Sequence, residues 1–390
     1  MTRLITLGLA LCIAVGSQAI AAADIVLDFS HANATLFDTN TTNGVLARAA
    51  VQQAANDISE ALNATLAPLS PDINPSTNQY RVTGTGTVNL ATATSTYDAT
   101  YGYTNPTTNA NEIFNPQSLG ANEVRIFVGS QNLGGDTLGV GGPGGFQSGQ
   151  AGLSSGGGFS QQDVDNAAAM AVADMNAQAN AVFGRGGSSP VFGDASGSVG
   201  GNPYSINFNA SLGNLWFDTD TNNVNGTDSA MELDDFWHFD ANSATDPNKI
   251  DFYTVALHEM LHAIGIGTAD SWTDLVSPFV DGMTSRDWLG PNAIALAGSG
   301  SDLIEPDAAH IEIGTTSLRL SDGMLQEVVM DPDIEFGQRK ELTQLDIAFL
   351  QDIGWANANS SLQANAIPEP AIASLLGLTM VLLATRRRRV

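Results

Sequence analysis

Two histidines four residues apart, with a glutamate between them, are the residues of this chain best suited to chemistry. They are His258, Glu259 and His262, and apolar residues recur at helical spacing around them from Val255 to Ile264. Residues four apart lie on one face of a helix, so both imidazoles can bind one cation. The pattern therefore predicts a zinc site in which Glu259 holds a water molecule without binding the metal itself.

The ends of this helix can also be predicted. Asp251 is suited to cap its first turn, and Gly265 to end it, because glycine adopts the left-handed conformation at low cost. The alternative interpretation is a buried helix with two hydrogen-bonded histidines. The position of the motif on a well-delimited helix favours the metal site.

A catalytic zinc needs a third protein ligand and one open position. Asp270 is close in sequence to the helix, whereas a ligand farther along the chain would need a long excursion. Such an excursion adds only about 0.6 kcal/mol of closure entropy per doubling of loop length. The candidates are His310, Asp270, His238 and His31.

The N-terminal segment predicts export. An apolar run from Leu4 to Val15 follows Arg3, and Ala21 to Ala23 offer a cleavage site, so residues 1–23 are predicted to be a secretory signal peptide. The only cysteine, Cys12, lies in this segment. The exported chain is therefore expected to contain no disulfide.

The charge of the chain is strongly negative. The total is −27, and without the two terminal segments nine basic residues face 40 acidic ones, a net charge of −31. Such a charge repels nucleic acid, so we expect no nucleic-acid partner.

The hydrophobic pattern predicts an α/β (α+β) fold over residues 24–362. Residues Gly134 to Gly158 are predicted to form a loop or flap. Helices are predicted at Asn43 to Leu66, Asp163 to Ala181 and Leu342 to Ile353, and strands at Ile25 to Phe29, Tyr80 to Tyr103, Val124 to Val128, Ser205 to Asn209 and Leu215 to Phe217.

An acidic segment lies between the last of these strands and the motif helix. Asp218, Asp220 and Asn222 alternate as in the opening of a calcium loop, without the glutamate that closes an EF-hand. Ca²⁺ is therefore a second candidate cation, and a solvated acidic turn is the alternative.

The motif helix resembles that of the metzincin zinc peptidases, whose pattern is His-Glu-x-x-His-x-x-Gly-x-x-His. Gly265 matches, but Thr268 stands where that pattern has its third histidine. His310, then Met330, then the helix from Leu342 follow in an order similar to the leishmanolysin-like branch, where an insertion separates the glycine from the third ligand. The resemblance covers roughly residues 205–355.

This resemblance implies an architecture, a mechanism and a ligand set. The fold would have a twisted N-terminal sheet, the motif helix and an irregular C-terminal subdomain, with a cleft between the two parts near Gly265. Zinc would activate a water molecule, Glu259 would act as the general base, and Met330 would form a turn beneath the metal. The implied zinc ligands are His258, His262 and His310.

The C-terminal segment, residues 363–390, resembles the PEP-CTERM sorting signal of Gram-negative bacteria. Pro368-Glu369-Pro370 precede an apolar run from Ala371 to Ala384, and Arg386 to Arg389 follow. The resemblance implies an exosortase-type partner, transient contact with the inner membrane, and release at the cell surface or outside the cell. An ordinary C-terminal anchor is the alternative.

Together these features predict an exported zinc endopeptidase that acts on proteins or peptides. One rival is a noncatalytic surface or extracellular-matrix protein with a decayed peptidase fold. Another is a calcium-dependent adhesive module, which only the acidic segment supports. The intact Glu259 favours the enzyme, because a purely structural zinc site does not need it.

Overall fold

The computed structural model describes residues 23–355, apart from short gaps at 33, 70–71, 75, 116–117, 225 and 281. Helices and strands are mixed through this part of the chain, so the fold is of the general α/β class. The predicted signal peptide (except for Ala23) and the predicted sorting signal lie outside the described residues. Within the part that is described, no helix is both long enough and apolar enough to cross a membrane.

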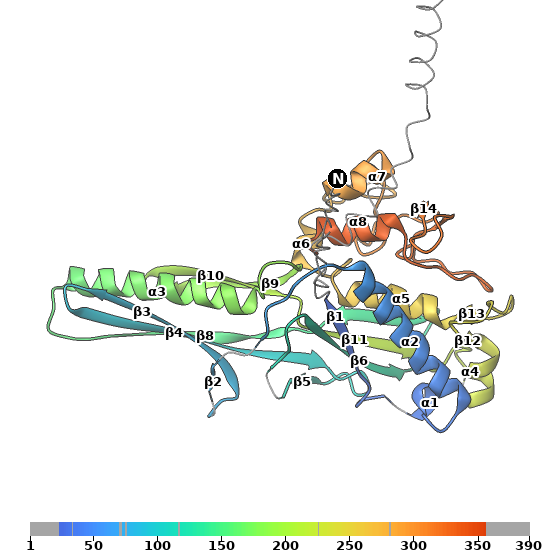
Figure 1. Ribbon diagram of the computed structural model, residues 1–390, viewed down its shortest axis with the longest axis horizontal. Coiled ribbons are helices and arrows are strands. Elements are labelled where there is room, and N and C mark those ends of the chain that lie inside the picture. The colour runs from blue at the N-terminus through green and yellow to red at the C-terminus, as the bar shows by residue number, and fades with distance from the viewer. Residues whose placement is uncertain are drawn as a thin grey trace, which may run out of the picture.

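A four-stranded sheet with the order β1-β6-β11-β7 forms the body of the molecule (Figure 1). Its first three strands are parallel, and β7 is an antiparallel edge strand. Two helices, α2 and α5, lie side by side against the sheet. The bounds are β1 Asp24–Asp28, α2 Thr42–Ala61, β6 Glu123–Gln131, β7 Gly139–Pro143, β11 Leu212–Asp218 and α5 Phe252–Ala263.

A long arm projects from this body (Figure 1). It consists of antiparallel strands covered on one face by helix α3, whose backbone lies close to the strands. A Cβ atom at Gly84 or Gly86 would lie within 2.2 Å of that backbone. The elements of the arm are β3 Gln79–Val88, β4 Ala91–Thr104, β8 Phe146–Ser155, α3 Gln161–Phe183, β9 Val191–Val199 and β10 Asn202–Asn209, with the short strands β2 Asp72–Asn74 and β5 Asn111–Ile113 at its base.

Arg185 joins the arm to the body. Its side chain is fully buried and donates hydrogen bonds to four backbone carbonyl oxygens from three separate segments. Burial lowers its pKa to about 10, so the guanidinium stays charged at neutral pH. The acceptors are the carbonyls of Ala67, Gly120, Glu123 and Ala210.

The region beyond α5 is mostly loops with short elements, and it packs above α5 in Figure 1. One apolar core includes residues from Ala23 to Trp355, so this region and the sheet share a core. Its elements are α6 Asp270–Thr273, α7 Pro291–Ala297, β14 Thr316–Leu318, β15 Leu325–Glu327 and α8 Gln344–Asp352. The remaining described elements are α1 Ala34–Phe37, α4 Ala230–Phe236, β12 Trp237–His238 and β13 Ile250–Asp251.

The prediction of a loop or flap at residues 134–158 is wrong. This stretch contains β7 and most of its second half forms β8, paired with β4. Two of its glycines, Gly141 and Gly149, lie where neighbouring backbone comes close: a Cβ atom would lie 1.9 Å from Glu259 O at Gly141 and 1.0 Å from Asp98 O at Gly149. A glycine strand of this kind carries no alternating side chains from which it could be recognised.

Candidate metal centre

The ends of helix α5 are fixed by polar contacts. Asp251 is fully buried, and its carboxylate accepts hydrogen bonds from the backbone N of Thr254 at 3.1 Å and its hydroxyl at 2.7 Å. Arg339 pairs with the same carboxylate at 2.7 Å. Such a cap typically contributes about 1 kcal/mol. At the other end Gly265, with φ of 125°, turns the chain away as predicted.

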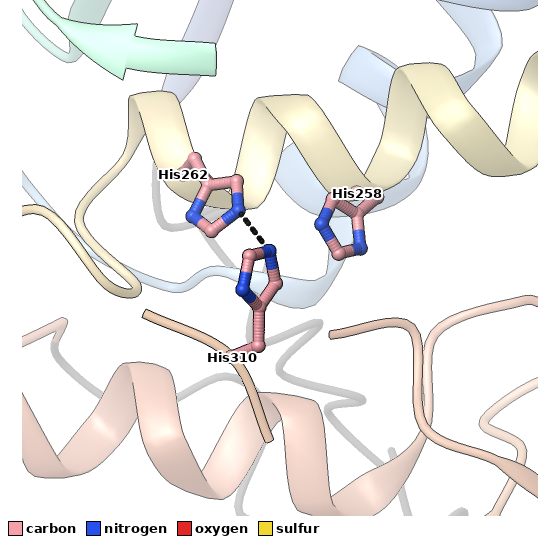
Figure 2. A group of neighbouring side chains, drawn as sticks. All are labelled: His258, His262 and His310. Atoms are coloured by element: carbon pink, nitrogen blue, oxygen red, sulfur yellow. Dashed lines mark hydrogen bonds between the residues drawn. The ribbon is translucent and has the colours of Figure 1, made fainter. Parts of the chain in front are cut away.

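Three histidines meet on one side of this helix (Figure 2). His258 and His262 come from successive turns of α5, and His310 comes from the loop after α7. One ring nitrogen from each lies within 4.8 Å of the other two.

The loop with His310 reaches α5 through contacts near Gly267. A Cβ atom at Gly267, whose φ is 74°, would lie 2.5 Å from Ala309 O, so glycine allows the two backbones to touch. The indole of Trp272 donates to Ala308 O at 2.7 Å, and Ile311 N donates to the backbone of the 328–331 turn at 3.0 Å. These contacts hold the loop on both sides of His310.

Each histidine is oriented through its Nδ1 atom. That of His258 lies 2.8 Å from Val329 O, and that of His262 lies 2.8 Å from Ile266 O. The Nδ1 of His310 lies 2.6 Å from the carboxylate of Asp307. A carbonyl or carboxylate oxygen only accepts, so Nδ1 carries the proton in all three rings and each Nε2 keeps a lone pair for a metal.

This arrangement suits a cation. The Nε2 atoms of His262 and His310 face each other at 3.2 Å, the contact dashed in Figure 2. With both Nδ1 atoms protonated, two lone pairs are opposed unless a proton or a metal ion lies between them. Burial, and then His310, lower the pKa of His262 to about 4, which disfavours the proton at neutral pH. Burial and the neighbouring rings likewise lower the pKa of His258 well below its ordinary value. Three imidazoles fit zinc, which is commonly held by three ligands with a fourth position open.

Glu259 belongs to α5, and it packs against the edge strand β7. It is 7% exposed, and the backbone N–H of Gly141 donates to its carboxylate. Cβ atoms at Gly139 and Gly141 would lie 2.7 Å from Glu259 Cγ and 1.9 Å from Glu259 O, so only glycine allows this approach. Burial raises the pKa of Glu259 to about 8, against the effect of the Gly141 N–H. A divalent cation beside it would lower that pKa.

Met330 lies in a buried turn connected to this centre. The neighbouring Val329 accepts from His258, and its own N–H donates to Asp346 at 3.1 Å. Asp346 also forms a capping box with Thr343 at the start of α8. The turn, helix α8 and His258 are therefore linked by hydrogen bonds.

A cleft of about 290 Å³ opens onto the centre. It is lined by residues from both sides of Gly265, including His258, Glu259 and His310. A larger hollow of about 450 Å³ contains none of the three histidines. Its polar groups bind each other, as Tyr253 with Asp57 at 2.6 Å, so we place the site in the smaller cleft.

The other candidate ligands lie elsewhere. Asp270 begins α6 and is not one of the three residues that converge. His31 contacts Tyr103 at 2.7 Å, and His238 lies 3.0 Å from Asp240 O. Among the described residues, the three histidines are the one group of His, Cys, Asp or Glu that meets within 4.8 Å.

The acidic segment is held mainly by local hydrogen bonds. Asp228 accepts from Thr221 and Asn222, and one oxygen of Asp220 accepts from Asn132 at 2.8 Å. The other oxygen of Asp220 is buried without a partner in the described part of the chain. Calcium at this position stays a prediction.

Three kinds of residue in the site were not identified from the sequence. These are Asp307, whose carboxylate orients His310; Asp346, whose carboxylate holds the 328–331 turn; and Gly139 and Gly141, which leave room for Glu259. Of these, only Asp307 has a local signal in the sequence, because it lies three positions before His310.

Comparison with known proteins identifies no relative: no protein-family model, curated protein or solved structure matches the chain.

Proposed function

We propose that the protein is an exported zinc-dependent endopeptidase of metzincin type. The observation that carries the proposal is the convergence of three Nε2 lone pairs beside a buried glutamate in an open cleft. Export rests on residues 1–23, and release by an exosortase-type enzyme on residues 363–390. The metzincin interpretation is supported by the order of the histidines, the turn at Met330 and the last helix.

The ligands of the zinc would be His258, His262 and His310. When bound, zinc supplies a Lewis acid that polarises the peptide carbonyl and makes water acidic. Glu259 would accept the proton of the attacking water and pass it to the leaving amine. The Gly141 N–H holds its carboxylate in place, and burial excludes competing solvent.

The edge strand β7 offers a place for the substrate backbone. It ends the sheet order and lines the cleft through Gly139. An extended peptide can pair with such an edge through main-chain hydrogen bonds, which favour peptides over other substrates.

Glu259→Gln tests the proposal. The change keeps the shape of the side chain but removes the proton acceptor, so hydrolysis of an unfolded protein should fall by about 10²–10⁴-fold. Zinc content, measured by elemental analysis, should stay at one ion per chain. Near-native hydrolysis by this variant would contradict the role of Glu259. A zinc-loaded wild type without any hydrolysis would favour the noncatalytic surface protein instead.

A further inference from the structure

The cleft beside the histidines carries two free carboxylates. Asp136 lies in the segment before β7, and Asp333 lies after the 328–331 turn. Both residues are exposed. Neither carboxylate has a hydrogen-bond or ion-pair partner among the described residues.

The one lysine that lines the cleft is buried and paired with groups of the protein itself. The side chain of Lys340 is 1% exposed, and its ammonium donates to Asp333 O at 2.5 Å. Glu327 lies 3.3 Å and Asp331 3.6 Å from the same nitrogen. The ammonium is therefore buried beside two carboxylates that balance its charge, so it offers no exposed positive charge to an anionic substrate group.

Asp331 is the remaining acidic residue of the lining besides Glu259, and its carboxylate has hydrogen-bond partners within the protein. It is buried, and its carboxylate accepts from the backbone N–H groups of Gly314 and Asp333. Asp331 and Lys340 therefore form a paired part of the cleft wall. Apart from Glu259 and a metal ion at the histidines, the charge that a substrate side chain would meet in the cleft therefore comes from Asp136 and Asp333.

We infer that this cleft selects peptides with a lysine or arginine side chain next to the cleaved bond, an inference that rests on the proposed peptidase function. The methylene groups of such a side chain can pack along Leu138, Val255 and Ile334, which also line the cleft. Its charged end then reaches the free carboxylates. A glutamate side chain at the same place is repelled by them, and the net charge of −27 adds to that repulsion.

Matched peptides test this selectivity. Quenched fluorescent peptides differ only by Lys, Gln or Glu on either side of the cleaved bond. We expect kcat/KM for Lys to exceed that for Gln by about fivefold, as for a partly exposed ion pair, with Glu below Gln. The preference should weaken in 1 M salt, where exposed charges are screened. Asp136→Asn and Asp333→Asn should each lower the Lys-to-Gln ratio, and the double variant should abolish it. Asp235→Asn, the same change on an exposed part of α4 outside the cleft, should leave the ratio unchanged.

Binding separates this inference from the proposed function. The Kd of the Lys and Glu peptides is measured with the Glu259→Gln variant, which does not need to turn over. If the wild type cleaves Lys and Glu peptides equally well, or prefers Glu, the charge selectivity is refuted and the peptidase stands. If the zinc-loaded wild type cleaves no peptide, the peptidase proposal fails. Selectivity is then judged by the two Kd values, and equal values refute it.

Discussion

The approach of Glu259 to strand β7 can be tested with two neighbouring glycines. Gly141→Ala places a methyl group 1.9 Å from Glu259 O, whereas Gly142→Ala places one with no atom within 4 Å. Both residues lie in β7, and neither has a positive φ. The two substitutions therefore change the strand equally and differ in their contact with α5.

The expected loss of stability and of activity in Gly141→Ala follows from the distance of 1.9 Å between the added methyl group and Glu259 O. An ordinary contact is at least 3.4 Å, so β7 and α5 must separate by about 1.5 Å. Overpacking of this kind costs about 1–3 kcal/mol of unfolding free energy. A displacement of about 1 Å between reacting groups lowers the rate by about 100-fold, and Gly141 also donates to the Glu259 carboxylate.

Peptide hydrolysis and urea denaturation measure the two effects. We expect Gly141→Ala to lose about two orders of magnitude in kcat/KM and about 2 kcal/mol of stability. Gly142→Ala should stay close to the wild type in both. Equal behaviour of the two variants would refute the idea that contact with β7 positions Glu259.

Three further outcomes are expected. His310→Ala should weaken zinc binding by about 100-fold in competition with a chelator, and Asp270→Ala by less than twofold; the reverse ranking would favour Asp270 as the ligand. Calcium should raise the thermal unfolding temperature of the zinc-loaded protein, and Asp220→Asn should remove that effect; no response to calcium in the wild type would leave the acidic segment a solvated turn. Mass spectrometry of secreted protein should find a C-terminus before Val390, and an intact C-terminus would contradict processing of the tail.

The sequence predicted best the elements with a strong hydrophobic period. Helix α5 begins and ends beside the expected Asp251 and Gly265 because cap, apolar spacing and stop signal agree. The helix expected from Asn43 to Leu66 exists but ends at Ala61, where Leu62 adopts an extended conformation despite its apolar side chain. Local signals therefore predicted that helix but placed its end five residues too late.

The missing parts of the site depend on contacts between distant segments. His310 follows His262 at a separation of 48 residues, and no pattern in the sequence between them shows where the chain returns. The return depends on the touching backbones at Gly267 and Ala309, which only the folded chain reveals. The same holds for Gly141, since its role comes from the absence of a side chain beside a helix more than 100 residues away.

The arm has a consequence for the order of folding. Asp24 pairs with Glu123, and Arg125 with Leu212, so each parallel pair of the central sheet closes a loop of about 90–100 residues. Most of the arm lies inside these loops, and its own β3–β4 hairpin pairs residues adjacent in the chain. Local contacts form before distant ones, so the arm should become structured first and shorten the search that brings β1, β6 and β11 together. Weakening the arm should then slow refolding much more than it speeds unfolding, even though the arm lies far from the histidines.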